Sequence, residues 1–261
     1  MNPPYALITG ASSGIGLELA HVYAEHGYNL VLIAQDNERL SAVAKTLERE
    51  YGQKVHSLTL DLTSSNWFSQ LTKFLENKKL EIDVAINNAG FGLYGPATET
   101  SFADEQNMIE LNIITLTRLS KYFARQMKKR GSGSIINVAS VAGFYPGIYM
   151  SVYYATKAYV LSYSLALAEE LAKSGVHVMA LCPGPTKTNF VARAKATRSR
   201  IFGKPMQARV VAEQCYRGMK HSKRLVVIGG RNKASVFLSR FLPHTISASS
   251  ASGEWKVKRR E

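Results

Sequence analysis

The segment from Tyr5 to Ala34 constrains the fold of this chain more than any other stretch. A short apolar run, Tyr5–Thr9, leads into the sequence GASSGIG at residues 10–16, and apolar residues then recur with helical spacing as far as Gly27. Residues 29–34 form a second apolar run of strand length. A strand, a glycine-rich turn, a helix and a second strand within about thirty residues make a βαβ unit. We therefore predict an α/β fold built on a parallel sheet.

The glycine-rich turn also predicts a class of ligand. It leads directly into a helix N-terminus, whose unpaired N–H groups and partial positive charge attract a phosphate group. Glycines allow the tight turn and let a ligand approach the backbone closely. The turn therefore predicts a nucleotide site, which in such sheets lies beyond the carboxyl ends of the strands. Asp61, Asn88, Ser140 and Thr186 are all expected at or just after strand ends, so they are candidates for the same site.

Strands and helices alternate along the rest of the chain. Further strands are expected over residues 55–60, 83–86, 133–140, 176–181 and 225–228, and helices over residues 38–51, 67–75, 102–129, 151–173 and 207–221. This alternation predicts a doubly wound, mainly parallel seven-stranded sheet with helices on both faces. We expect one domain over residues 1–246, with a variable substrate-covering segment at 187–206 and a flexible basic tail at 247–261.

Two of the expected helices carry apolar residues at helical spacing. The helix over 102–129 is expected to bury one side consisting of Leu111, Ile114, Leu116, Leu119, Phe123 and Met127. The helix over 151–173 is expected to be capped by Ser151 and to bury Ala155, Ala158, Leu161 and Leu165.

Tyr153 and Lys157 lie four residues apart on the second of these helices, so they share one face. An ammonium group near a phenol favours the phenolate, and we expect Lys157 to lower the pKa of Tyr153 from its ordinary value of about 10. Tyr153 is therefore a candidate general acid/base. Tyr154 is a competing candidate, and a tyrosine at this place in a buried helix can also serve packing alone.

The charge of the chain is concentrated in its last part. The net charge is +14, with 33 Lys+Arg and 19 Asp+Glu. Residues 187–261 contain 18 Lys+Arg and 3 Asp+Glu, a net of +15, so residues 1–186 contain 15 basic and 16 acidic residues, a net of −1. This asymmetry suggests an anionic partner such as an acidic substrate, a cofactor phosphate, a nucleic acid or a membrane surface. A solvated basic face without a specific partner is the alternative.

Cysteine content and the first residues bear on the compartment. The two cysteines, Cys182 and Cys215, cannot form a disulfide framework or a metal cluster, and they suit a reducing cytosol. The sequence MNPP at the start has no charged n-region and no long apolar run, so we expect no signal peptide and a cytoplasmic protein.

Taken in order, the motifs resemble those of the short-chain dehydrogenase/reductase family, over nearly everything from Tyr5 to about Gly229. Ser140 precedes Tyr153 by thirteen residues, a spacing that the family uses. The resemblance implies a Rossmann-like fold. It rests on TGASSGIG at 9–16, Asp61, NNAG at 87–90, Asn112, Ser140, Tyr153-x-x-x-Lys157 and Pro183-Gly184.

The resemblance implies an NAD(P)-dependent oxidoreductase that transfers hydride between a nicotinamide cofactor and a carbonyl or alcohol substrate. Tyr153 would protonate the carbonyl oxygen, while Lys157 would lower the Tyr153 pKa and bind the nicotinamide ribose. Ser140 would hold the substrate oxygen, and Asn112 would position a water molecule that links Lys157 to solvent. Because hydride addition builds negative charge on oxygen, preorganised donors there favour the transition state. The family spacing selects Tyr153 over Tyr154.

The same resemblance implies where the cofactor binds. The glycine-rich turn would meet the pyrophosphate and ribose, and Asp61 and Leu62 would border the adenine. No metal ligand is expected. The predicted cofactor-binding residues are Gly10, Ser12, Ser13, Gly14, Ile15, Gly16, Gln35, Asp61, Leu62, Asn88, Gly90, Tyr153, Lys157, Pro183, Gly184, Thr186 and Thr188.

Residues after the second strand bear on the choice of cofactor. NAD-binding proteins usually have an acidic residue at the end of that strand, where it binds the ribose 2′-OH. Here that position is Ala34, which leaves room for a 2′-phosphate, but Gln35 and Asp36 follow instead of an arginine. Arg39 could reach the phosphate or lie solvated on the helix. NADP(H) is therefore favoured, with NAD(H) as the alternative.

The C-terminal part leaves the substrate and the partners open. Basic residues of the 187–206 segment could bind an acidic acyl thioester, a phosphate or a carboxylate, or they could be solvated. Apolar residues between 236 and 246 could cap the site, pack in an oligomer, or make a weak peripheral contact between residues 231–261 and an anionic membrane. The family often pairs through the two long helices, so a homodimer or homotetramer is expected.

The sequence leaves three candidate functions for this protein. The first is a reductase or dehydrogenase of a small carbonyl or alcohol substrate, with 3-oxoacyl-[acyl-carrier-protein] reductase as its runner-up version, although FGLY at residues 91–94 does not resemble that subgroup. The second is a non-catalytic nucleotide-sensing scaffold, which Ser140, Tyr153, Lys157 and Asn112 argue against. The third is nucleic-acid binding, for which we find no recognition motif, so no nucleic-acid partner is expected.

Overall fold

The sheet of the computed structural model confirms the predicted α/β class. The structure describes residues 3–194, 205–239 and 241. Within them, seven strands form one sheet in the order β3-β2-β1-β4-β5-β6-β9, and every neighbouring pair is parallel. The strands are β1 Tyr5–Thr9, β2 Asn29–Ala34, β3 Val55–Thr59, β4 Val84–Asn87, β5 Gly133–Val138, β6 Val176–Cys182 and β9 Leu225–Val227.

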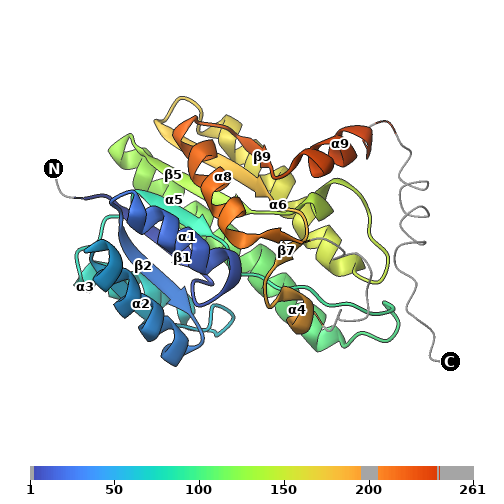
Figure 1. Cartoon of the computed structure of the whole chain (residues 1–261), viewed down its shortest axis with the longest axis horizontal. Helices are drawn as coiled ribbons and strands as arrows, with labels where there is room; N and C mark the ends of the chain where they lie inside the picture. Colours follow the sequence, from blue (N-terminus) through green and yellow to red (C-terminus); the bar gives the residue numbers. More distant parts are fainter. Residues whose placement is uncertain (1–2, 195–204, 240, 242–261) are drawn as a thin grey trace.

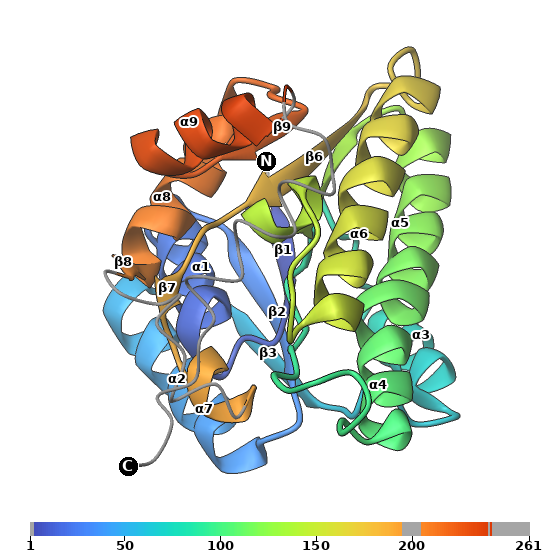
Figure 2. The same cartoon turned by 90° about the vertical axis from the view of Figure 1, so that its right-hand side faces the viewer.

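Helices cover both faces of this sheet, as a doubly wound fold requires (Figures 1 and 2). One face carries α1 Gly14–Glu25, α2 Asn37–Tyr51 and α8 Ala208–Lys220. The other face carries α3 Trp67–Asn77, α5 Leu116–Arg130 and α6 Ser151–Glu170.

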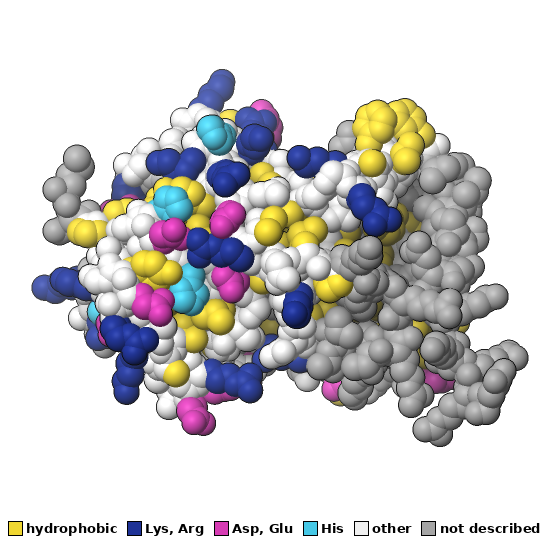
Figure 3. All heavy atoms as spheres, viewed as in Figure 1, with side chains coloured by type: hydrophobic (Ala, Val, Ile, Leu, Met, Phe, Trp, Pro, Cys, Tyr) yellow, Lys and Arg dark blue, Asp and Glu magenta, His cyan; other side chains and the backbone are white. Residues whose placement is uncertain are grey.

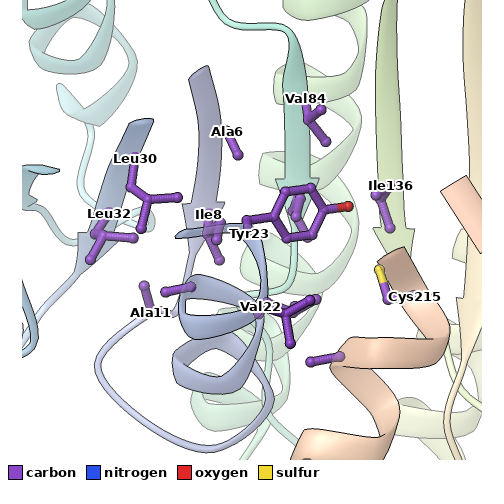
Figure 4. Close-up of a cluster of buried hydrophobic side chains, with 14 of the residues drawn as sticks. Ala6, Ile8, Ala11, Val22, Tyr23, Leu30, Leu32, Val84, Ile136 and Cys215 are labelled. Carbon is purple, nitrogen blue, oxygen red and sulfur yellow. The ribbon is translucent and has the colours of Figure 1, made fainter. Parts of the chain in front are cut away.

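The core lies in two layers, one between each set of helices and the sheet. On β1, Ala6 and Ile8 belong to the layer beneath α1, whereas Leu7 belongs to the layer on the opposite face. Figure 4 shows Tyr23 of α1 and Cys215 of α8 reaching toward the strands in the first layer. Strands buried on both faces are typical of parallel sheets and explain why these strands read as continuous apolar runs.

The helix predicted over 102–129 differs from the expectation in its middle. It consists of α4 Phe102–Ile109, a π-helical segment Glu110–Thr115 and α5. Ile114 was expected on the buried side, but it is 49% exposed. The π segment inserts an extra residue per turn and so rotates the side chains that follow it.

Helix α6 also buries a different face from the one expected. Ala155 and Ala158 are exposed and Leu165 is 37% exposed. The prediction of a buried side chain is therefore wrong at three of the four positions. Ser151 is the first residue of the helix, and no side-chain cap bond is formed there. The buried face consists of Tyr154, Thr156, Lys157, Val160, Leu161, Ser164, Leu167 and Ala168. Polar groups lie on this face because they form the site described below.

Several short elements beyond β6 were not predicted. Strands β7 Thr186–Lys187 and β8 Met206–Gln207 pair in parallel, α7 spans Phe190–Arg193, and α9 spans Gly230–Ser239. Residues 195–204, half of the predicted variable segment at 187–206, and all of the predicted tail at 247–261 lie outside the described residues. Among the helices that the structure describes, none has the length and apolar character needed to cross a membrane.

Candidate active site

A cavity of about 890 Å³ lies at the carboxyl edge of the sheet, where the nucleotide site was expected. Of the predicted site residues, only Gly16 and Asn112 do not line it. The predicted residues that do are Gly10, Ser12, Ser13, Gly14, Ile15, Gln35, Asp61, Leu62, Asn88, Gly90, Ser140, Tyr153, Lys157, Pro183, Gly184, Thr186 and Thr188.

The glycine-rich turn has the geometry of a phosphate cradle. Gly10 and Gly14 have φ values of +69° and +59°, which residues with a side chain rarely adopt. A Cβ on Gly16 would lie only 2.2 Å from the carbonyl oxygen of Gly10. Gly16 therefore allows α1 to approach the turn, although it does not itself face the cavity. The turn and the helix N-terminus fit a dinucleotide pyrophosphate.

Asn88 ties the end of β4 to the end of β1. Its side-chain amide donates to the carbonyl oxygen of Thr9 at 2.8 Å, and its backbone N–H donates to the Thr9 hydroxyl at 3.0 Å. The backbone N–H of Ala89 donates to the same hydroxyl at 2.9 Å. Asn88 thus fixes the floor of the cavity, and Thr9, which was absent from the predicted site, takes part in this contact.

Polar residues after β2 and β3 form one end of the cavity. Asp36 caps α2 by accepting a hydrogen bond from the backbone N–H of Arg39 at 3.0 Å, and the Arg39 side chain pairs with it at 3.3 Å. Although partial burial opposes the shift, hydrogen bonds from Thr63 and Gln35 hold the pKa of the Asp61 carboxyl below its ordinary value. Asp61 is therefore an ionised hydrogen-bond acceptor at neutral pH.

Lys157 is a buried residue of the cavity wall. Its Nζ donates to the carbonyl oxygen of Val138, at the end of β5, at 2.8 Å. The same atom lies 5.8 Å from the centroid of the Tyr153 ring. Burial lowers the pKa of the lysine to about 8, because a charged ammonium group is poorly solvated there.

The pKa of Tyr153 departs from the expectation. Burial raises it to about 12, and only a hydrogen bond with the Ser140 side chain acts in the opposite direction. The prediction that Lys157 lowers this pKa is therefore wrong for this structure, because the ammonium group is directed at Val138 rather than at the phenol oxygen. A phenol with a raised pKa is protonated at neutral pH, the form that can donate a proton.

Backbone groups hold the Ser140 hydroxyl in the position where it contacts Tyr153. The Ser140 hydroxyl accepts a hydrogen bond from the backbone N–H of Ala142 at 3.1 Å and lies 3.4 Å from the carbonyl oxygen of Pro183. Ser140 and Tyr153 thus present two hydroxyl groups side by side to the cavity.

Asn112 lies behind the wall, on the π-helical segment. Its amide group donates to the carbonyl oxygen of Phe91 at 2.9 Å and to the hydroxyl of Thr156 at 3.1 Å, and its oxygen accepts from the backbone N–H of Phe91 at 3.2 Å. A Cβ on Gly90 would lie 2.8 Å from the Asn112 oxygen and 3.6 Å from Lys157 Nζ. Gly90 therefore leaves the space into which the ends of the Asn112 and Lys157 side chains both reach.

Residues 4–199 of this chain match the family model of the short chain dehydrogenases. This match covers three quarters of the chain. The chain belongs to the short-chain dehydrogenase family. It is an oxidoreductase that interconverts alcohol and carbonyl groups with a nicotinamide cofactor.

Individual members of the short-chain dehydrogenase family show how far the similarity extends. An uncharacterized oxidoreductase of Staphylococcus saprophyticus is 35% identical over 183 residues, which is 70% of this chain and 78% of that protein. A short-chain dehydrogenase from Sphingobium yanoikuyae, solved in complex with NADPH, is 30% identical with a TM-score of 0.82, over 99% of this chain and 98% of the other. A short-chain dehydrogenase/reductase from Burkholderia phymatum, in complex with NAD, is 26% identical with a TM-score of 0.82, over 91% and 92%.

The other end of this short-chain dehydrogenase's cavity is aromatic and was not predicted as a set. A Cβ on Gly92 would lie 2.8 Å from Phe190 Cζ, 2.9 Å from Met150 Cε and 3.1 Å from Tyr153 Cδ2, so these side chains crowd around the backbone of the loop after β4. Their common signal in the sequence is position, because they come after strands β4, β5 and β6, in loops or in the first turns of helices α6 and α7. The cavity-lining residues that pack together in this aromatic cluster are Ala142, Tyr145, Met150, Tyr153, Tyr154 and Phe190. Further lining residues that were not predicted include Phe91, Asn107, Leu111, Val141, Pro185, Asn189 and Arg193.

Proposed function

We propose that this chain reduces a bulky, apolar carbonyl compound, with Tyr153 as the acid/base. The observation that carries the proposal is the placement of the Ser140 and Tyr153 hydroxyl groups and of Lys157 on the wall of one cavity that also contains the glycine-rich turn. When bound, a nicotinamide cofactor supplies the hydride for reduction or accepts it for oxidation.

Residues of this chain would perform the remaining steps. Ser140 donates a hydrogen bond to the substrate oxygen and so orients it against the Tyr153 hydroxyl. Tyr153 gives its proton to that oxygen as negative charge develops there. Lys157, whose ammonium group lies 5.8 Å from the centroid of the Tyr153 ring, would bind the nicotinamide ribose and so hold the cofactor beside the tyrosine. Asn112, which is bonded to the backbone of Phe91, would position a water molecule that links Lys157 to solvent.

NADP(H) is the favoured cofactor, with NAD(H) as the alternative. Ala34 lines the cavity at the end of β2, where its small side chain leaves space for a 2′-phosphate. The carboxylate of Asp36 lines the cavity nearby and acts against a phosphate, although Arg39 partly neutralises it. The Sphingobium and Burkholderia structures hold NADPH and NAD respectively, so similarity alone supports either cofactor.

The aromatic end of the cavity supports a substrate with a large apolar body. Tyr145, Tyr154, Phe190 and Met150 offer apolar surface there, and such surface favours rings or acyl chains. Arg193 adds a cation to this end of the wall. That cation favours the second candidate, reduction of a 3-oxoacyl thioester, because the carrier of such a substrate brings anionic groups.

A homodimer or homotetramer and a cytoplasmic location are also proposed. Ile114, Tyr159 and Leu165 are large apolar or aromatic side chains on the outer faces of the two long helices, and they are 49%, 38% and 37% exposed. A second copy of the chain would cover them. Cys182 and Cys215 are both buried free thiols, which suits a reducing compartment.

An activity assay with the purified protein tests the proposal. The protein is mixed with NADPH or NADH and a panel of ketones, aldehydes and 3-oxoacyl thioesters, and the decrease in absorbance of the reduced cofactor is measured. We expect turnover with bulky ketones, and a loss of at least about a thousandfold in Tyr153→Phe. Tyr163→Phe is the matched control on the same helix, because its buried hydroxyl has no partner among the described residues. No oxidation of either cofactor with any substrate, or equal rates in both variants, contradicts the proposal.

A further inference from the structure

Helix α9 is attached to the rest of the protein along one side. The side-chain amide of Asn232 donates to the carbonyl oxygen of Ile228 at 2.6 Å, and it lies so close to Gly184 that a Cβ there would come within 2.2 Å. Val236, one turn further along, is 5% exposed. These contacts fix the helix beside Gly184, which lines the catalytic cavity.

The opposite side of α9 presents apolar side chains to solvent. Phe237 and Leu238 are each 59% exposed, and Phe241, just beyond the helix, is 72% exposed. The rings of Phe237 and Phe241 pack edge to face at 5.3 Å, so they form one continuous patch. Figure 3 shows hydrophobic side chains gathered on the surface over α9. Exposed aromatic rings in contact with one another mark an interaction surface rather than scattered surface residues.

Basic residues border this patch on both sides. With about 3.6 residues per turn, Arg231 falls on one border of the Phe237–Leu238 face and Lys233 on the other. Both are exposed, and neither forms an ion pair with any residue that the structure describes. Residues 231–261 contain 7 Lys+Arg and 2 Glu, a net charge of +5.

We propose that α9 docks on the surface of a lipid bilayer that contains anionic lipid. Phe237, Leu238 and Phe241 enter the boundary between headgroups and acyl chains, and Arg231 and Lys233 contact the anionic headgroups. An apolar face bordered by cations is complementary in both polarity and charge to such a surface, and it lies parallel to it without spanning it. The proposal goes beyond the catalytic function and does not depend on the substrate. Because α9 adjoins Gly184, docking brings the cavity close to the bilayer.

Cosedimentation of the full-length protein with vesicles tests this surface without any measurement of activity. One set of vesicles contains phosphatidylcholine alone, and the other also contains about one third phosphatidylserine. We expect binding to the anionic vesicles that weakens with salt. Phe237→Ser/Leu238→Ser and Arg231→Glu/Lys233→Glu should each lower the partition coefficient at least about tenfold.

Two control variants carry single substitutions of the same kinds away from α9. Phe102→Ser removes an aromatic ring that is 76% exposed, and Lys45→Glu reverses an exposed charge on α2. Both should bind the vesicles like the unchanged protein. Equal binding by the α9 variants and the controls overturns the proposal. So does a change in the molar mass in solution when Phe237 and Leu238 are replaced, because the patch would then bind a second copy. If Arg231→Glu/Lys233→Glu retained vesicle binding but lost binding to double-stranded DNA, the basic residues would bind nucleic acid instead of lipid, and the proposal would be wrong.

Discussion

The Lys157 ammonium group donates a hydrogen bond to the carbonyl oxygen of Val138 at 2.8 Å, which joins α6 to the carboxyl end of β5. The lysine is 6% exposed, and this burial lowers its pKa to about 8. A group whose proton is held less tightly in the folded state than in the unfolded chain destabilises the fold at pH values where both states are protonated. The buried position of Lys157 therefore lowers the free energy of unfolding.

Replacing the lysine should recover part of this stability. A fall in pKa from 10.5 to about 8 corresponds to about 3 kcal/mol, and the lost hydrogen bond to Val138 offsets about 1 kcal/mol of it. We expect Lys157→Met to raise the free energy of unfolding at pH 7 by about 1–2 kcal/mol while abolishing activity. Urea denaturation followed by circular dichroism measures the difference.

The pH dependence of that difference gives a sharper test. Between pH 8 and about 10.5 the unfolded chain holds the Lys157 proton and the folded protein does not, so the stability of the unchanged protein rises with pH in this window. The advantage of Lys157→Met should therefore shrink by more than half at pH 9.5. A constant difference from pH 7 to 9.5 would falsify the assignment of a buried, charged lysine.

Gly92 allows the loop after β4 to reach Tyr153. A methyl group there would lie 3.1 Å from the Tyr153 ring and closer still to the ends of Phe190 and Met150. These side-chain ends can move, so Gly92→Ala should fold normally but displace the ring and lower kcat about tenfold. Gly95→Ala is the control, because its methyl group would lie 3.2 Å from Thr100 Cγ2, away from the cavity. Equal kcat in the two variants would show that the loop does not position Tyr153.

A buried hydrogen-bond network of amides and hydroxyls connects the sheet to α6. The Asn87 amide donates to the Asn137 oxygen at 2.8 Å, and the Asn137 amide donates to the Ser164 hydroxyl at 3.0 Å. All three residues are at most 2% exposed. Asn137→Ala leaves partners unsatisfied on both sides and should lower the free energy of unfolding by about 2–4 kcal/mol.

Ser164→Ala removes only the last hydroxyl of this hydrogen-bond network and should lower the free energy of unfolding by about 1 kcal/mol. Denaturant titrations of both variants check the order. If Ser164→Ala costs as much as Asn137→Ala, the helix rather than the sheet holds the network together.

Local signals in the sequence predicted most of the fold. The order of strands and helices follows from apolar runs, helical spacing and the glycine-rich turn, all of which act within about ten residues. The π-helical segment escaped prediction, because the extra residue per turn that rotates Asn112 and exposes Ile114 leaves the composition of a helix unchanged. The motifs also located Ser140, Tyr153 and Lys157.

Features that depend on long-range packing could not be predicted in the same way. The buried face of α6 carries Thr156, Lys157 and Ser164, and a pattern based on apolar residues selects the wrong face when function places polar groups inward. The pKa of Tyr153 depends on where the Lys157 ammonium group is directed, which a spacing of four residues does not determine. Tyr145 reaches the cavity from a loop and Phe190 from the four-residue helix α7, and no periodic pattern predicts segments this short.

Asp36 should act against NADPH, because its carboxylate lies on the cavity wall next to Gln35. Asparagine caps a helix as well as aspartate does, so Asp36→Asn keeps the bond to the Arg39 backbone, removes the repulsive charge and leaves the Arg39 side chain free to meet a phosphate. We expect the ratio of kcat/KM for NADPH to that for NADH to rise about three- to tenfold. Glu38→Gln, which removes a charge from the first turn of the same helix but does not line the cavity, should leave the ratio unchanged. A ratio that stays constant or moves toward NADH in Asp36→Asn would mean that the 2′ position of the ribose lies away from this carboxylate, and the choice of cofactor would then rest on Ala34 and Gln35 alone.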